Sequence, residues 1–253
     1  MKKILLSLVV PLVFMMTLSA QILQEQADEI VQQRLESETK PYCLYAQKEV
    51  QTEFEITTAT GEVLELGYSA WVYYVSYTGE ANGKYLIVKE NNGNLLEVNT
   101  KNDADPDDLE KWRFVPIEIL FEEYSLEGTS CQWINLNYLF DDNAELIIIN
   151  NNEELGNYIS CTEGSYPEID FSKYTLLLAS GRSWNYIEDD DKRAAFFKIA
   201  RDEYTMNVII CQTIQFQSVK WQVSILVSKI ANEETITLDV WYGTYGSNPE
   251  QCF

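Results

Sequence analysis

The chain has 253 residues and a formal net charge of −22 at pH 7, with 40 acidic residues, 18 basic residues and no histidine. Such a charge argues against binding to nucleic acids or anionic membranes, because both are recognised through clustered Lys and Arg. The lack of histidine removes the commonest general base, the usual zinc ligand and the middle member of hydrolytic triads.

The first twenty residues have the pattern of a cleavable signal peptide. Lysines at positions 2 and 3 precede an apolar run from Ile4 to Leu18, and the small residues Ser19 and Ala20 follow. This run is shorter than the roughly 20 residues that a spanning helix needs. We predict a signal peptide at 1–20 and a periplasmic, cell-surface or secreted protein without a membrane span after cleavage. Because this segment holds two lysines and no acid, the mature charge becomes −24.

Residues 21–98 are expected to form an α+β domain. Helical spacing places apolar residues on one face of residues 22–36: Leu23, Ala27, Ile30, Val31 and Leu35. Short β-rich runs then alternate with turn residues such as Thr60-Gly61, Gly79 to Gly83 and Asn92-Gly93. The expected strands are Tyr42–Val50, Phe54–Thr58, Val63–Leu66, Trp71–Tyr77, Lys84–Lys89 and Leu95–Val98. One helix packed on an antiparallel meander is the predicted fold.

An acidic linker is predicted at 99–111, followed by a β-rich, sandwich-like domain at 112–253. The linker contains Asn, Asp, Pro and Lys with little to bury. Strands are expected at Leu146–Ile149 and Tyr174–Ala179, with a short helix after Asn152. Three later runs alternate with period two, which is typical of antiparallel sheet with one wetter face. Their apolar positions are Tyr204, Met206, Val208 and Ile210; Trp221, Val223, Ile225 and Val227; and Ile236, Leu238 and Val240.

The five cysteines lie far apart and form no Cys-x-x-Cys pair, so neither a zinc cluster nor a thioredoxin-like redox site is indicated. They are Cys43, Cys131, Cys161, Cys211 and Cys252. Export would permit disulfides, and Cys131 paired with Cys161 or Cys211 would staple the second half. Buried, unpaired cysteines are the alternative, since Cys behaves as a small core hydrophobe.

The amino-terminal half resembles the PepSY-like modules of exported bacterial proteins. Four segments carry the resemblance: Ala27-x-x-Ile30-Val31-x-x-Arg34-Leu35, Trp71-Val72-Tyr73-Tyr74-Val75, Tyr85-Leu86-Ile87-Val88 and Gly93-Asn94-Leu95-Leu96-Glu97-Val98. Through Ile169 to Leu178, the second half resembles the β-sandwich domains of small exported protease-inhibitor-like proteins. Taken whole, the chain is similar to two-domain exported proteins of gut-dwelling Gram-negative bacteria. These resemblances imply binding or inhibition rather than catalysis and supply no catalytic residues.

No motif predicts a catalytic residue, a cofactor or a metal. The acids of the linker at 103, 105, 107 and 108 could hold a cation, but an EF-hand-like loop would need Gly at 108 and an acid at 114, where Asp108 and Phe114 stand. Solvated linker acids are the simpler interpretation, and Asp189 to Asp191 and Asp141-Asp142 are likewise expected to be solvated loop tips. Ser37-x-x-Lys40 has the spacing of a serine acyltransferase motif, yet its Lys-Thr-Gly companion is missing.

Aromatic residues in loops are the remaining signal, because Trp and Tyr anchor interfaces with an apolar face and a polar group. The candidates are Trp184, Tyr186, Tyr242 and Tyr245. Core packing or incidental exposure is the alternative. The sequence therefore predicts an exported, non-catalytic protein that binds a protein or peptide, and the resemblance of the second half implies a protease-inhibitor-like role. The alternative is a glycan-binding or glycan-active envelope protein.

Overall fold

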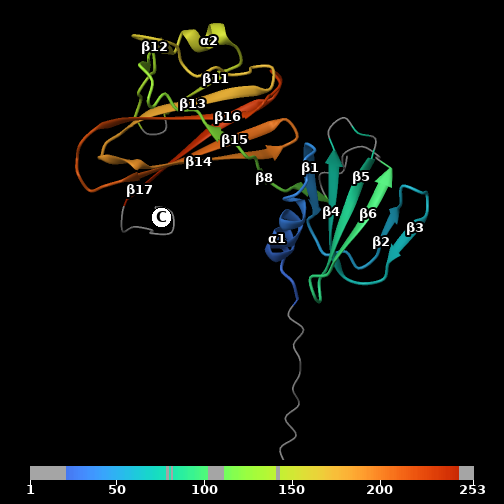
Figure 1. The fold of residues 1–253 in the computed structure, drawn as a ribbon. Coiled ribbons are helices and arrows are strands. Elements are labelled where there is room, and N and C mark those ends of the chain that lie inside the picture. Colours follow the sequence, from blue (N-terminus) through green and yellow to red (C-terminus); the bar gives the residue numbers. More distant parts are fainter. Residues whose placement is uncertain (1–20, 78–79, 81, 102–110, 141–142, 245–253) are drawn as a thin grey trace, which may run out of the picture. The chain divides into compact units, whose positions relative to one another are not determined.

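A computed structural model describes residues 21–77, 80, 82–101, 111–140 and 143–244 (Figure 1). These residues are rich in β-strands and include two helices, α1 (Gln24–Leu35) and α2 (Asn152–Gly156). The predicted signal peptide, linker residues 102–110 and Tyr245 lie outside the described residues. The chain divides into two compact units: one contains residues up to Pro41 and Ala46–Trp112, the other Tyr42–Tyr45 and Arg113 onward. In the described part, no helix is long and apolar enough to cross a bilayer.

A five-stranded sheet of order β6-β5-β4-β1-β7 dominates the first half of the chain. Its strands are β1 (Tyr42–Gln47), β4 (Ala70–Tyr77), β5 (Asn82–Lys89), β6 (Leu95–Lys101) and β7 (Trp112–Phe114). A separate hairpin joins β2 (Phe54–Thr57) to β3 (Val63–Leu66). The predicted strands of this region are thereby confirmed within a few residues, although β6 continues to Lys101, three residues into the segment expected to be linker.

Helix α1 buries Ala27, Val31 and Leu35, which are spaced four residues apart on one helical face. Two hydrogen bonds attach the helix region to β4: the Trp71 indole donates to the Ile22 carbonyl at 2.9 Å, and the Tyr73 hydroxyl donates to Asp28 at 2.7 Å. Leu23 was expected on the buried face but is largely exposed. It is the residue before the first helical turn, where its N–H is capped by the Gln26 side chain.

A cluster of charged and polar side chains beside α1 has a structural role. The ammonium of Lys84, on β5, is nearly buried and lies 3.2 Å from Glu38 and 3.7 Å from Glu97. The Tyr77 hydroxyl donates to Glu38 at 2.7 Å, and this bond, together with Lys84, lowers the pKa of the Glu38 carboxyl. Burial and the same bond raise the pKa of Tyr77. The acids thus compensate the buried positive charge, as a nearly buried lysine requires.

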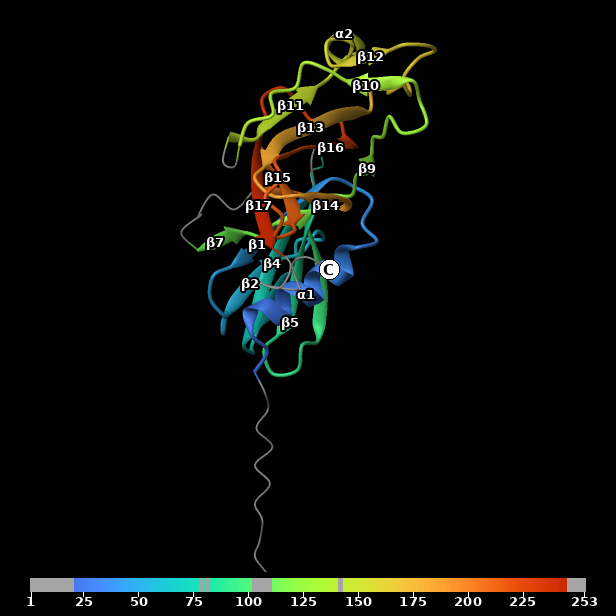
Figure 2. The ribbon, with the colours of Figure 1, turned by 90° about the vertical axis from the view of Figure 1, so that its left-hand side faces the viewer.

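The second unit contains two four-stranded sheets of order β11-β13-β16-β9 and β17-β15-β14-β8, and a two-stranded ribbon of β10 and β12 (Figures 1 and 2). The strands are β8 (Ile117–Glu118), β9 (Glu122–Glu123), β10 (Cys131–Trp133), β11 (Glu145–Ile149), β12 (Ile159–Cys161), β13 (Tyr174–Ser183), β14 (Ile187–Ala200), β15 (Glu203–Gln212), β16 (Val219–Ser228) and β17 (Thr235–Thr244).

Strand β13 is buried on both faces. Leu177 and Ala179 join the core shared by the two four-stranded sheets, which also holds Phe196, Met206 and Trp221. The alternate residues Leu176 and Leu178 belong to a second core with residues of α2, β11 and β12. Because side chains of a strand alternate between faces, a strand buried on both sides reads as a continuous apolar run. The sequence prediction of a buried strand at this position is confirmed.

The expectation of purely antiparallel pairing is wrong for β17, which pairs with β15 in parallel. The intervening strand β16 belongs to the other four-stranded sheet, so the chain leaves the sheet of β15 and returns to it. The chain reverses direction before β16 and again after it, so β17 runs in the same direction as β15. Parallel neighbours require such a crossover, whereas a tight hairpin would have made them antiparallel.

The expectation that Asp189 to Asp191 form a loop tip is also wrong, because these residues lie within β14. The pairing of β14 with β15 shifts between Ile187, opposite Gln212, and Lys192, opposite Ile210. The acidic residues therefore occupy an irregular stretch of strand, where extra residues interrupt the ladder. Asp141 and Asp142, the other predicted tip, lie outside the described residues.

Candidate functional site

Two loops of the second unit lie at the same end of its sheets. Ser183, the last residue of β13, is opposite Val219, the first residue of β16, and Ile187 of β14 is opposite Gln212 of β15. The β13–β14 loop and the β15–β16 loop therefore emerge together. A third segment joins them through Leu139, whose carbonyl accepts a 2.8 Å hydrogen bond from the backbone of Arg182.

The β15–β16 loop is held in place at alternate residues. The Thr213 N–H donates to the Tyr186 carbonyl and the Tyr186 N–H donates to the Gln215 carbonyl, both at 2.9 Å. The Gln215 N–H donates to the Thr213 hydroxyl at 3.2 Å, and the Gln217 N–H donates to the Gln215 carbonyl at 2.9 Å. The loop is thus fixed by its own backbone and by the neighbouring loop.

Between these fixed positions, the apolar side chains point into solvent. Phe216 is 95% exposed and Ile214 is 79% exposed. On the neighbouring segments, the ring of Phe140 stacks on Trp184 with centroids 3.9 Å apart, and Trp184 is itself 56% exposed. We call Leu139, Phe140, Trp184, Ile214 and Phe216 the apolar loop end.

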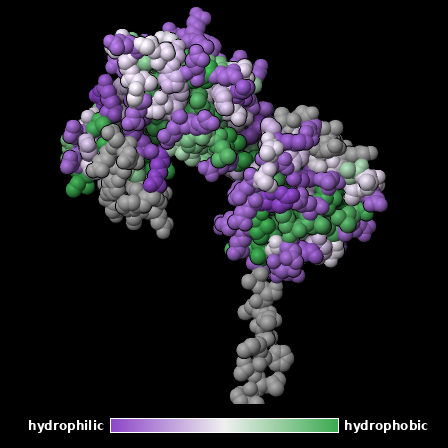
Figure 3. Space-filling view, in the orientation of Figure 1, coloured by the Kyte–Doolittle hydropathy of each residue, from purple (hydrophilic) through white to green (hydrophobic). Residues whose placement is uncertain are grey.

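Exposed apolar residues matter when they gather, since single ones are ordinary on protein surfaces. Hydrophobic patches interrupt an otherwise largely hydrophilic surface in the view of Figure 3. At the apolar loop end, the exposed residues come from three segments that are linked by hydrogen bonds. Such a grouping is typical of an interaction surface.

The structure describes three of the four predicted aromatic residues, and they lie in different surroundings. Trp184 belongs to the apolar loop end, and Tyr186 provides the backbone groups that hold the β15–β16 loop. Tyr242 lies on β17 against the shared core, where its hydroxyl accepts a 3.2 Å hydrogen bond from the Trp221 indole. Tyr245 lies outside the described residues.

Ile214 and Phe216 were missed by sequence reasoning. In the segment Thr213 to Gln217, apolar and polar residues alternate, which is the pattern of a half-buried strand rather than of a loop. The usable signal was the end of the regular core positions at Cys211, followed by the segment Thr213 to Gln217, which contains no Gly, Pro, Asn, Asp or Ser to mark a turn.

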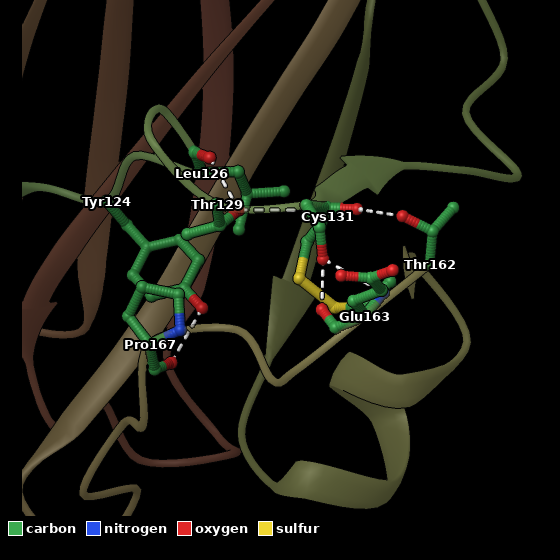
Figure 4. Close-up of a disulfide and its surroundings, with 9 residues drawn as sticks. Tyr124, Leu126, Thr129, Cys131, Thr162, Glu163 and Pro167 are labelled. Atoms are coloured by element: carbon green, nitrogen blue, oxygen red, sulfur yellow. Dashed lines mark hydrogen bonds between the residues drawn. A yellow bond between two sulfur atoms is a disulfide. The ribbon is translucent and has the colours of Figure 1, made fainter.

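A disulfide joins Cys131 of β10 to Cys161 of β12, one of the pairings that the sequence left open (Figure 4). The two residues are directly opposite in the antiparallel ribbon. Side chains around the bond reinforce it: the Thr129 hydroxyl donates to the Leu126 carbonyl at 2.6 Å and accepts from the Cys131 N–H at 3.1 Å, and the Ser130 hydroxyl accepts from the Glu163 N–H at 3.0 Å. The ribbon is thus tied covalently and by hydrogen bonds.

Tyr124 is buried beside this ribbon, with its ring edge against Trp133 and its hydroxyl donating to the Pro167 carbonyl at 2.8 Å. Burial, followed by the neighbouring Tyr166, raises the pKa of Tyr124 to about 12. Folding therefore favours the neutral phenol. The resulting stabilisation is complete below the unfolded pKa of about 10 and is lost as the pH rises toward 12.

Tyr124→Phe is expected to lower the free energy of unfolding at pH 8 by about 1 kcal/mol, because the Pro167 carbonyl loses its donor. Between pH 10 and 12 this difference from the wild type should shrink, since only the wild type loses stability by ionising Tyr124. Urea denaturation at pH 8 and at several pH values between 10 and 12 measures the difference in the free energy of unfolding. An absorbance titration at alkaline pH should show one fewer tyrosine with a raised pKa in the variant. A constant difference across this range would contradict the assignment.

Among the described residues, no group of three His, Cys, Asp or Glu side chains is placed to hold a metal ion. The predicted cation candidates at 103, 105, 107 and 108 lie outside those residues. Lys40, of the Ser37-x-x-Lys40 motif, forms an exposed ion pair with Glu80 at 2.6 Å.

The chain matches no protein-family model, no curated protein and no solved structure.

Proposed function

We propose that this is an exported, non-catalytic protein that binds a protein or peptide partner through the apolar loop end. In this proposal, residues 1–20 are a signal peptide, the first domain is a PepSY-like α+β module, and the second is a β-sandwich that presents the binding loops. The observation that carries the proposal is the β15–β16 loop, which is fixed by four hydrogen bonds while Ile214 and Phe216 remain exposed.

A loop that is already ordered loses less conformational entropy when it binds, so more of the contact energy appears as affinity. Phe216 is the natural anchor, because aromatic residues that fill a partner's pocket dominate interface energetics. The stacked pair of Phe140 and Trp184 offers a second apolar surface, and its segment is hydrogen-bonded to the β15–β16 loop through Tyr186. We therefore expect a partner with an apolar pocket large enough for a phenylalanine side chain.

Electrostatics define the partner further. With a formal charge of −24 after removal of residues 1–20, the chain attracts a partner whose interface is surrounded by basic residues and repels an acidic one. Charges at the rim of an interface act mainly on the association rate. We expect the association rate with the partner to fall as salt increases, while the dissociation rate depends on Phe216.

The double substitution Ile214→Ser/Phe216→Ser tests the proposal. Affinity purification of the tagged protein from its native envelope should enrich a protein with the wild type that the variant does not retain. With that protein purified, the dissociation constant should rise at least about 100-fold, the equivalent of roughly 2.7 kcal/mol for the loss of a central anchor and its neighbour.

Leu120→Ser is the matched control, because Leu120 is 91% exposed but lies between β8 and β9 rather than in the apolar loop end. It should bind like the wild type. The proposal is wrong if Ile214→Ser/Phe216→Ser retains every partner of the wild type. It is also wrong if size-exclusion chromatography shows that these residues only join two copies of this chain.

A further inference from the structure

A polar groove of about 830 Å³ lies in the second unit, between the disulfide-linked ribbon and the edge of the sheet that contains β16. Glu123 of β9, Gln132 of β10, Lys192 of β14 and Gln222 of β16 contribute to its walls. Its volume falls in the range of about 300–1,000 Å³ that is typical of small-ligand sites. Unlike most such sites, it is lined mainly by hydrogen-bonding groups.

Four polar side chains of the groove are uncommitted. Glu123, Glu127, Gln132 and Lys192 make no side-chain hydrogen bond or ion pair with the rest of the described residues. Two carboxylates can accept hydrogen bonds, an ammonium can donate, and an amide can do both. A ligand whose polar groups can both donate and accept hydrogen bonds would pair with all four of these side chains.

Aromatic side chains complete the lining. Trp133 is half-buried and is braced by the edge of Tyr124, with centroids 6.0 Å apart. Tyr138 is held by Lys220, whose ammonium lies 4.5 Å from the ring centroid, and by Gln222. Both rings are therefore fixed before any ligand arrives. An aromatic ring offers an apolar face to C–H groups, whereas the surrounding polar groups bind hydroxyls.

We propose that this groove binds a short neutral oligosaccharide. Sugar hydroxyls both donate and accept, which matches the uncommitted groups, and the C–H faces of sugar rings match Trp133 and Tyr138. An anionic ligand fits poorly, because the groove is lined by two carboxylates, Glu123 and Glu127, and one ammonium, Lys192, in a mature chain of charge −24. An apolar ligand would leave these polar groups without hydrogen bonds. The site shares no residue with the apolar loop end, although Tyr138 directly precedes Leu139, and it does not depend on the proposed partner.

The probes are five linear tetrasaccharides: cellotetraose, maltotetraose, mannotetraose, xylotetraose and chitotetraose. Saturation-transfer NMR and calorimetry on the full mature chain should show binding of at least one of them and none of tetragalacturonate, the anionic counterpart. Glu127→Ala/Gln132→Ala should weaken that binding at least about tenfold, because two ligand hydrogen bonds are lost. Both side chains are exposed and without partners, so the variant should fold like the wild type.

Glu153→Ala, at an exposed acid of α2, is the control and should bind like the wild type. Ile214→Ser/Phe216→Ser should also keep the sugar, which separates this site from the proposed protein-binding surface. Three results would overturn the inference: no tetrasaccharide binds at millimolar concentration, binding is unchanged in Glu127→Ala/Gln132→Ala, or tetra-alanine competes for the same groove.

Discussion

Gly181→Ala is expected to destabilise the second unit by about 1–3 kcal/mol, the usual cost of forcing a methyl group into a packed core. Gly181 of β13 is directly opposite Trp221 of β16. A β-carbon at position 181 would lie 2.5 Å from Cζ2 and 2.7 Å from Cε2 of the indole, closer than any real contact of that kind. The indole has little room to move, because it is 1% exposed and its N–H donates to Tyr242.

Urea denaturation monitored by tryptophan fluorescence measures the effect, and Gly156→Ala provides the matched control. A β-carbon at Gly156 would meet nothing within 4 Å, so this substitution should be neutral or stabilising by up to about 1 kcal/mol in α2.

A double-mutant cycle isolates the cause. Phenylalanine lacks the indole atoms that collide with the added methyl group, so Gly181→Ala should cost less in a Trp221→Phe background. A coupling of at least about 1 kcal/mol is expected for residues in such direct contact. If the two substitutions are additive, the close approach is not what makes glycine necessary at position 181.

The same arrangement explains an error of sequence interpretation. A strand was predicted to end at Ala179, and residues 79–83 were taken as a turn, because isolated glycines usually mark turns. In the structure, β13 runs through Gly181 to Ser183, and β5 includes Gly83. An added β-carbon at Gly83 would lie 2.5 Å from the Tyr74 hydroxyl. Both glycines lie under aromatic rings within a sheet, a tertiary requirement that no local pattern reveals.

Turns that need a left-handed backbone were predictable. Gly61 and Gly93 have φ angles of +90° and +68°, which glycine adopts without strain. The predicted turns at these glycines are confirmed, as is the strand Val63–Leu66 between them. Strand β14, by contrast, was missed: its run Lys192 to Ala200 does not alternate, and three aspartates precede it. Its place in the sheet depends on pairing with β15 rather than on its own pattern.

The candidate sites, too, are partly predictable from local sequence and partly dependent on tertiary contacts. The loop aromatic Trp184 was found because composition marks it, whereas Ile214 and Phe216 gain their meaning from hydrogen bonds between two loops. The polar groove brings β9 and β10 together with β14 and β16, which lie far from them in the sequence. Its side chains are individually ordinary, so only their arrangement in space indicates a binding site.

Removal of the Cys131–Cys161 disulfide should lower the free energy of unfolding by about 3–4 kcal/mol. The two cysteines are 30 residues apart, and a cross-link over a loop of that length restricts the unfolded chain by about this amount. The folded ribbon itself keeps its backbone pairing and the side-chain bonds of Thr129 and Ser130. The loss should therefore come mainly from the greater freedom of the unfolded state.

Cys131→Ser/Cys161→Ser tests this expectation in urea, with Gln132→Ala/Ser160→Ala as the control. Gln132 and Ser160 are the next opposed pair of the same ribbon and are both exposed, so their truncation should change stability by less than about 0.5 kcal/mol. A loss below about 1 kcal/mol in the serine variant would contradict the entropic argument. Because the folded ribbon keeps its backbone pairing, Cys131→Ser/Cys161→Ser should still bind the tetrasaccharide under conditions in which it is folded, and the apolar loop end should keep its partner.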